Sequence, residues 1–114
     1  MHAFDVLGDP VRRRILELLA EEDHTSGEVV TVIRSEFGLT QPAVSQHLRV
    51  LRENGFARVR PDGTRRIYRL DPAGVDPVDR WLAGIHSAWE QRLDALATEI
   101  ARGKRDRGRR GRDT

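Results

Sequence analysis

The sequence predicts a mainly α-helical fold with one small β-hairpin and a long C-terminal helix. Three observations lead to this prediction. Apolar residues recur at helical spacing in successive segments up to residue 51, and they alternate with polar residues from 56 to 70. Beyond residue 76 one apolar stripe continues at helical spacing to residue 100. Because 114 residues are enough for only one modest core, we expect a single domain over residues 1–102 that includes this long helix.

Two helices are expected at the start of the chain. Phe4 and Leu7 lie three residues apart, which is enough for one short helical turn. Asp9 is a suitable N-cap, and Pro10 suits the first helical position because its missing N–H costs nothing there. The apolar residues that follow at helical spacing are Val11, Ile15, Leu18 and Leu19.

The next two helices form a helix-turn-helix pattern. Thr25 is expected to cap a helix that Gly38 stops. Thr40 then caps another helix, which ends at Asn54 and Gly55. The apolar side of this second helix holds Val44, Leu48 and Leu51. Two helices separated by so short a break are typical of the helix-turn-helix.

A β-hairpin is expected directly after these helices. Residues 56–60 alternate between apolar side chains and arginine, and residues 65–70 can form the returning strand. The connection at residues 61–64 contains an Asp-Gly pair, which favours a tight hairpin turn. A hairpin in this position is a wing, so the predicted architecture is a winged helix-turn-helix.

The last helix, which Asp76 and Pro77 are expected to open, carries the apolar stripe. One small domain would struggle to cover so long a stripe, so we expect a dimerisation helix rather than packing on its own domain alone. Trp81 and Trp89 are expected in the core of the dimer, with a pocket for an apolar effector as the alternative. The residues assigned to the dimer interface are Phe4, Leu7, Val78, Trp81, Leu82, Ile85, Trp89, Leu93 and Leu96.

Positive charge is concentrated in the middle of the chain and at its end. Residues 40–70 contain seven arginines and two acidic residues, a net charge of +5. Residues 103–114 contain six basic and two acidic residues, a net charge of +4. Since the whole chain carries only +2, the remaining residues carry −7. A localised basic surface on an acidic body predicts binding to a phosphate backbone, and hence double-stranded DNA as the partner.

The helix that Thr40 caps is the expected recognition helix. Such a helix buries one face and presents polar side chains near its N-terminus to base edges, where glutamine can pair with adenine and arginine can reach guanine or phosphate. The alternative is an ordinary amphipathic helix with a solvated polar face. Two further arginines follow the hairpin turn, where they could contact DNA or only protect an exposed strand edge. The expected DNA-binding residues are Thr40, Gln41, Ser45, Gln46, His47, Arg49, Arg52, Arg65 and Arg66.

Several classes of function are excluded or disfavoured. The chain has no cysteine, which excludes disulfides, thiolate metal sites and cysteine nucleophiles. Ser45 and His47 lie two residues apart on a helix and cannot face each other, and no other catalytic set is present, so we expect no enzyme, no metal and no cofactor. The absence of a long apolar run and of a signal peptide predicts a soluble, cytoplasmic protein without membrane contact.

The end of the chain lacks apolar residues from Gly103 onward, so residues 103–114 are expected to form a disordered basic tail. This tail could add nonspecific affinity for DNA or could be only a solvated end. His47 has a similar pair of interpretations, as a phosphate contact or as a neutral ring packed at the edge of its helix.

Four segments carry a family resemblance. They are GDPVRRRILELL at residues 8–19, LTQPAVSQHLRVL at 39–51, DGTRRIYRLDP at 62–72 and WEQRLDAL at 89–96. The first three resemble the ArsR family of winged-helix regulators, and the fourth resembles the last helix of a metal-independent branch. The resemblance spans about residues 3–102. It implies a dimer made by the first and last helices, an inverted-repeat operator and repression that an unidentified effector relieves.

The chain departs from the family pattern in two ways. Residues 31–36 add about one helical turn before the recognition helix. The thiolate metal site of the family lacks its cysteines here. For the family's other metal site, which is shared between the last helices of two subunits, the chain offers only Asp79, His86 and Glu90, a thin ligand set for zinc. A transcriptional activator or an architectural DNA binder would use the same contacts as a repressor. A protein adaptor that docks through the last helix is a further alternative.

Overall fold

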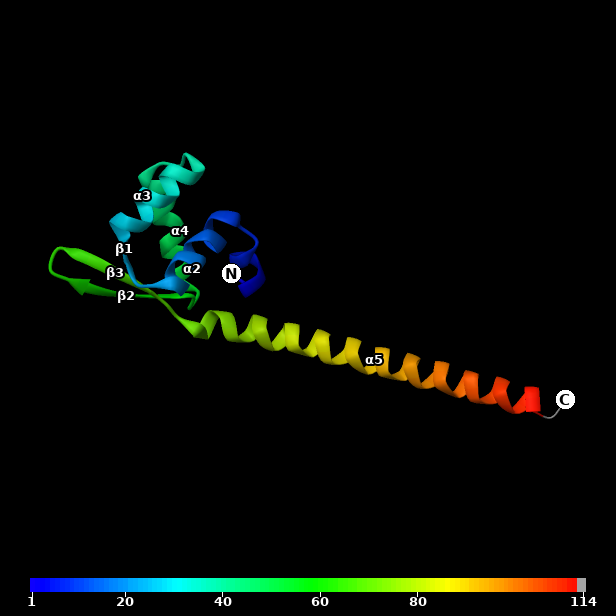
Figure 1. Ribbon diagram of the computed structural model, residues 1–114. Helices are drawn as coiled ribbons and strands as arrows, with labels where there is room; N and C mark the ends of the chain where they lie inside the picture. The colour runs from blue at the N-terminus through cyan, green and yellow to red at the C-terminus, as the bar shows by residue number, and fades with distance from the viewer. Residues whose placement is uncertain (113–114) are drawn as a thin grey trace. The chain divides into compact units, whose positions relative to one another are not determined.

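The computed structural model describes residues 1–112 of the chain, with the side chains of residues 1–105. The chain forms two compact units, Met1–Asp79 and a second unit that begins at Arg80. The elements are α1 (Ala3–Leu7), α2 (Pro10–Glu21), β1 (His24–Thr25), α3 (Ser26–Phe37), α4 (Gln41–Glu53), β2 (Ala57–Asp62), β3 (Arg65–Leu70) and α5 (Pro72–Arg112) (Figure 1). The predicted mainly α-helical class with a β-hairpin wing is therefore confirmed.

Helices α2, α3 and α4 begin at their predicted N-caps, and α3 and α4 end at their predicted residues. The Asp9 carboxylate accepts hydrogen bonds from the backbone N–H of Val11 at 2.8 Å and of Arg12 at 3.3 Å. The hydroxyls of Thr25 and Thr40 cap α3 and α4 in the same way. Gly38 ends α3 with φ +68°, a left-handed conformation that side chains with a Cβ rarely adopt.

Residues 31–36, which are predicted to add a turn before the recognition helix, lie within α3, and an ion pair joins them to α2. Arg14 donates from Nε and Nη2 to the two carboxylate oxygens of Glu36, at 2.9 and 3.0 Å. This bidentate contact lowers the pKa of Glu36.

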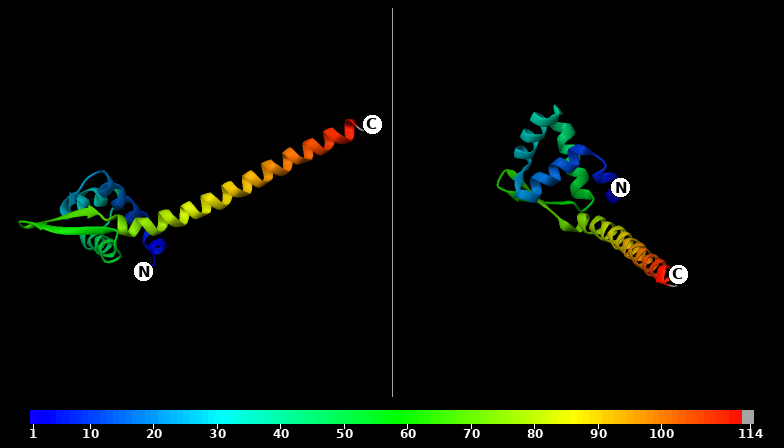
Figure 2. Two further views of the ribbon diagram at one scale, coloured as in Figure 1. Left: turned by 90° about the horizontal axis from the view of Figure 1, so that it is seen from below. Right: turned by 45° about the vertical axis from the view of Figure 1, so that its right-hand side comes forward.

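The sheet has three antiparallel strands in the order β1-β3-β2, one more than the hairpin predicted from the sequence. Strand β1 has only two residues, which pair with Tyr68 and Ile67 of β3. Strand β2 continues to Asp62, opposite Arg65, so the turn contains only Gly63 and Thr64. Pro61 is tolerated inside β2 because β2 is an edge strand, where a missing N–H need not break a ladder bond. The tip of this hairpin extends past the helices of its unit (Figure 2).

One hydrophobic core lies between the helices and the inner face of the sheet. Helix α4 contributes Val44, Leu48 and Leu51, the three residues predicted for its apolar side, and each is at most 1% exposed. Phe37, the last residue of α3, lies outside this core and is 40% exposed. The other side chains with less than 2% exposure are Phe56, Ile15, Ile33, Val6 and Val29.

Helix α5 begins at Pro72, earlier than the predicted start at Asp76 and Pro77. The Asp71 carboxylate caps this end: it accepts from the Ala73 N–H at 3.0 Å and from Arg58 Nε at 3.0 Å, and both contacts lower the pKa of Asp71. Pro72 occupies the first helical position, where its missing N–H costs nothing. Pro77 lies inside the helix, so the prediction that it opens the helix was wrong.

Helix α5 continues through the predicted domain boundary at residue 103 to Arg112. The side chains of the predicted tail beyond residue 105 lie outside the described residues, so a disordered tail and a domain end at residue 102 stay predictions. No helix in the described part of the chain is long and apolar enough to cross a bilayer.

Gly74 lies in the first turn of α5 against Phe56, and its replacement is expected to destabilise the protein. A Cβ at Gly74 would lie 2.6 Å from Cγ of Phe56 and 2.8 Å from the Gly55 carbonyl oxygen. Phe56 is buried in the core and cannot move aside, so Gly74→Ala should lower the free energy of unfolding by about 1–3 kcal/mol. Urea denaturation measures this change. Gly27→Ala in α3, where a Cβ meets only Thr25 Oγ1 at 3.9 Å, is the control; equal unfolding midpoints of the two variants would contradict the prediction.

Candidate nucleic-acid interface

Helix α4 has one buried face and one exposed polar face. Because Val44, Leu48 and Leu51 are buried at spacings of four and three, the polar residues on the opposite side of the helix point away from the core. The Thr40 hydroxyl accepts from the Ala43 N–H at 3.3 Å and so begins the helix at the end where base-reading side chains are expected. The exposed residues predicted to read DNA are Gln41, Ser45, Gln46, Arg49 and Arg52. The structure therefore places these five predicted side chains on one accessible helix.

An ion pair on this face leaves Arg49 accessible. Arg49 Nε lies 3.6 Å from Oε1 of Glu53, one helical turn further along α4. Both side chains are 59% exposed, and such surface pairs contribute at most about 1 kcal/mol. A phosphate or a guanine edge can therefore replace Glu53 at little cost in free energy, so Arg49 stays available to contact DNA.

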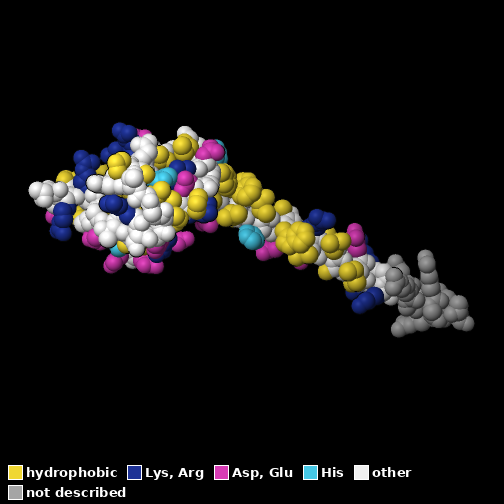
Figure 3. Space-filling model, turned by 90° about the horizontal axis from the view of Figure 1, so that it is seen from above, with side chains coloured by type: hydrophobic (Ala, Val, Ile, Leu, Met, Phe, Trp, Pro, Cys, Tyr) yellow, Lys and Arg dark blue, Asp and Glu magenta, His cyan; other side chains and the backbone are white. Residues whose placement is uncertain are grey.

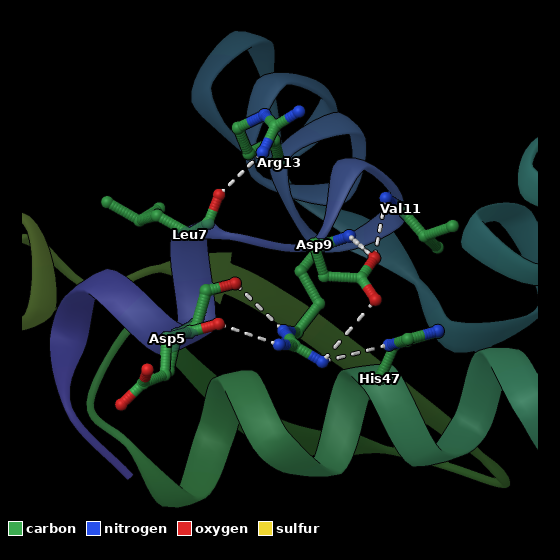
Figure 4. Close-up of polar contacts among 8 residues, drawn as sticks. Asp5, Leu7, Asp9, Val11, Arg13 and His47 are labelled. Carbon is green, nitrogen blue, oxygen red and sulfur yellow. Dashed lines mark hydrogen bonds and ion pairs between the residues drawn. The ribbon is translucent and has the colours of Figure 1, made fainter.

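His47 differs from the other predicted residues, because it is half-buried and contacts α2. Its Nδ1 lies 3.4 Å from Nη1 of Arg12 (Figure 4). Arginine has no acceptor atom, so a hydrogen bond between these atoms uses Nδ1 as the acceptor. The ring thus lies half-buried at the edge of α4. A phosphate contact and a neutral packed ring both stay predictions for His47.

Arg12 joins three helices at this point, a role that the sequence did not indicate. Its Nε donates to the carbonyl of Val6 at 2.8 Å, and its Nη2 donates to the carbonyl of Asp5 at 2.9 Å. Its Nη1 also lies 3.8 Å from the Asp9 carboxylate (Figure 4). Burial raises the pKa of Asp9, but the hydrogen bonds from the backbone N–H groups of Val11 and Arg12 and the nearby Arg12 guanidinium outweigh it, so the pKa is lowered. The site holds α1, the start of α2 and the middle of α4 together.

The wing presents its two predicted arginines next to the hairpin turn. Gly63 begins this turn with φ +63°, and Thr64 completes it. Arg65 and Arg66 are both exposed, and as neighbours on a strand they point to opposite faces of the hairpin. Arg65 Nη2 lies 3.4 Å from the Asp62 carboxylate, again an exposed and weak pair. Lysine and arginine side chains gather at the end of the first unit that holds the hairpin (Figure 3).

The predicted dimer residues fall into two groups. Leu7 and Val78 are half-buried, and Leu7 packs against the core of the first unit. Phe4 is 42% exposed, and the large apolar side chains of α5 form an exposed stripe (Figure 3). The members of this stripe are Trp81, Leu82, Ile85, Trp89, Leu93, Leu96 and Ile100, each between 44% and 61% exposed. The assignment of these residues to an interface stays a prediction.

No group of three or more potential metal ligands lies together among the residues whose side chains are described. This holds also for the surroundings of His86 and Glu90, the pair singled out in the sequence.

Comparison with known proteins gives the family. The family described as "Bacterial regulatory protein, arsR family" matches residues 9–59. The HTH-type transcriptional regulator Rv2034 of Mycobacterium tuberculosis is 36% identical over 97 residues, which cover 82% of this chain and 87% of that protein. The arsenical resistance operon repressor of Escherichia coli is 33% identical over 104 residues, covering 87% of this chain and 82% of that protein.

Solved structures agree with this result. The homodimeric winged helix-turn-helix DNA-binding domain of Mb0332 from Mycobacterium bovis, described as a possible ArsR-family regulator, is 25% identical with a TM-score of 0.54. The match covers 77% of this chain and 75% of that one. The predicted resemblance to the ArsR family is thus confirmed, whereas the metal-independent branch indicated by residues 89–96 stays a prediction. The chain belongs to the arsR family of bacterial regulatory proteins and is a DNA-binding transcriptional regulator, not an enzyme.

Proposed function

We propose that this protein is a homodimeric repressor that binds an inverted-repeat operator in promoter DNA, in the cytoplasm. The observation that carries the proposal is the exposed polar face of α4, which lies in the same compact unit as the arginine-tipped wing. A recognition helix reads base edges in the major groove while the wing contacts the adjacent backbone or minor groove. The DNA-reading residues are those predicted on α4, with Arg65 and Arg66 as backbone contacts.

The exposed stripe of α5 supports a homodimer. Large apolar side chains on one face of a helix are stabilised when a partner removes them from water, by about 1.5–3 kcal/mol for each fully buried side chain. A second copy of the same helix supplies a self-complementary surface with two-fold symmetry. The homodimeric relative from Mycobacterium bovis has the same fold. In such a dimer the two α4 helices enter successive major grooves about 34–36 Å apart, so the operator is two-fold symmetric.

Repression is supported by the name of the Escherichia coli relative, an operon repressor. An activator would make the same contacts with DNA, so repression and activation are distinguished by a separate experiment. Transcription in vitro from a promoter that the protein binds should fall when the protein is added, and a rise would show that the protein is an activator.

The operator itself is tested by selecting bound fragments from a genomic DNA library with the purified protein at near-physiological salt. We expect enrichment of a two-fold-symmetric sequence next to promoters. If no sequence is enriched, the repressor proposal fails and a protein adaptor that uses α5 becomes the better interpretation.

A further inference from the structure

One face of the hairpin β2–β3 carries more positive charge than the wing tip alone. Residues that lie directly opposite in an antiparallel pair share a face, and so does every second residue along a strand. The register therefore defines one set of residues on a common face, namely Arg58, Arg60 and Asp62 on β2 with Arg65, Ile67 and Arg69 on β3. We call its four arginines, Arg58, Arg60, Arg65 and Arg69, the outer arginine face.

The outer arginine face lies away from the core. On the opposite face Ala57 and Tyr68 are buried, and Val59 is half-buried against the helices. All four arginines are exposed. Packing of the core therefore does not explain why arginine occupies these four positions.

Folding alone does not account for this arrangement, because Arg58 lies directly opposite Arg69. Like charges directly opposite in a sheet destabilise it. Asp71 offsets part of this repulsion, since its carboxylate lies 3.0 Å from Arg58 Nε. Arg60 and Arg69 make no ion pair with any described residue. Two guanidinium groups are thus available for an external anion.

The shape and length of the face indicate an extended anion. An open hollow of about 220 Å³ is lined by Arg58, Val59, Arg60, Ile67 and Arg69. Alternate residues on a strand are roughly 6.7 Å apart, so the arginines form a line of charge rather than a single contact. The line ends at Arg65, already assigned to the DNA-contacting wing tip, and is continuous with that surface.

We propose that the outer arginine face binds backbone phosphates of duplex DNA beside the half-site that α4 reads. The inference rests on the proposed function and extends it by naming Arg60 and Arg69 as phosphate-binding residues. Phosphate contacts position a protein on DNA without reading sequence. The contact therefore increases the affinity for all duplexes alike and lengthens the footprint beyond each half-site.

The test is the salt dependence of DNA binding by the double variant Arg60→Gln, Arg69→Gln. Each lost phosphate contact lowers the steepness of log K against log salt by about 0.9, so we expect a decrease of about 1.8 and up to about a 60-fold loss of affinity at 0.1 M salt. The decrease should be equal for the operator and for a random duplex. Hydroxyl-radical footprinting should lose its outermost protected positions. Circular dichroism checks that the fold is unchanged.

The matched control is the double variant Arg80→Gln, Arg102→Gln, which removes the same charge from exposed positions of α5 away from its apolar stripe. Its salt dependence should match that of the wild type. An unchanged slope for Arg60→Gln, Arg69→Gln would overturn the inference, and so would a change of base preference. If the wild type still selects a symmetric operator in that case, the proposed repressor function is unaffected. If no operator is found, the dependence of log K on log salt can still be measured with the random duplex.

Discussion

Replacing Ile85 with glutamate is expected to convert the protein to monomers and to weaken operator binding by about a hundredfold or more. Ile85 lies in the middle of the α5 stripe and is 52% exposed in the single chain. In a symmetric dimer the substitution buries two carboxylates without partners, which costs more than the apolar contact stabilises. Each monomer then binds one half-site alone and loses the gain of about 10²–10⁴ that joining two binding units provides. Analytical ultracentrifugation and a gel-shift titration measure the two effects.

The control for this experiment adds the same charge to the other side of α5. Ser87 lies two positions from Ile85, so that Ser87→Glu leaves the apolar stripe intact. This variant should remain dimeric and bind the operator as the wild type does. A dimeric Ile85→Glu variant with full affinity would show that the stripe is not the interface, and the prediction for the whole set of α5 residues would fail with it.

Replacing Gln46 with alanine is expected to remove base discrimination at one position of each half-site. Gln46 is exposed on α4, opposite the buried face that begins at Val44. A glutamine that pairs bidentately with adenine provides about 1–3 kcal/mol of discrimination, so the ratio of affinities for the preferred and the substituted base should fall roughly ten- to hundredfold. Competition binding with operators that are changed one base pair at a time measures this ratio. Ser45→Ala should have a smaller effect in the same direction.

Arg66→Ala separates base reading from backbone binding. Arg66 is exposed beside the hairpin turn, where we expect a contact to phosphate, so its loss should weaken binding evenly across all operator variants. Arg66→Ala is preferred to Arg65→Ala, because Arg65 also forms an ion pair with Asp62 that its substitution would remove. If Arg66→Ala changed base preference and Gln46→Ala lowered affinity evenly, the assignments of the two elements would be reversed.

Elements that depend on local signals could be predicted closely. Asp9 followed by Pro10 begins α2 because the cap and the fixed φ act within four residues. Gly38 ends α3 because the left-handed conformation there is nearly free of cost only for glycine. The polar face of α4 followed from the same kind of information, since burying three residues at helical spacing leaves the polar residues on the opposite side exposed.

Features that depend on residues far apart in the sequence were missed or misplaced. Strand β1 has two residues and exists only because β3 offers it an edge to pair with. Helix α5 starts at Pro72 because the Asp71 carboxylate accepts hydrogen bonds from both the Ala73 N–H and Arg58, which lies 13 residues earlier in the chain. Asp76 and Pro77 carry an equally good local signal for a helix start, so the sequence alone did not distinguish the two positions.

The sequence by itself determined the order of the helices, the caps of α2, α3 and α4, the hairpin turn and the apolar stripe of α5, since each depends on side chains within a few residues of one another. Only the tertiary structure decided which basic side chains meet. It brings Arg12 of α2 to His47 of α4 across 35 positions, and the strand register places Arg58 opposite Arg69. The physical reason is that such contacts follow from how the elements pack and pair, which no spacing along the chain encodes.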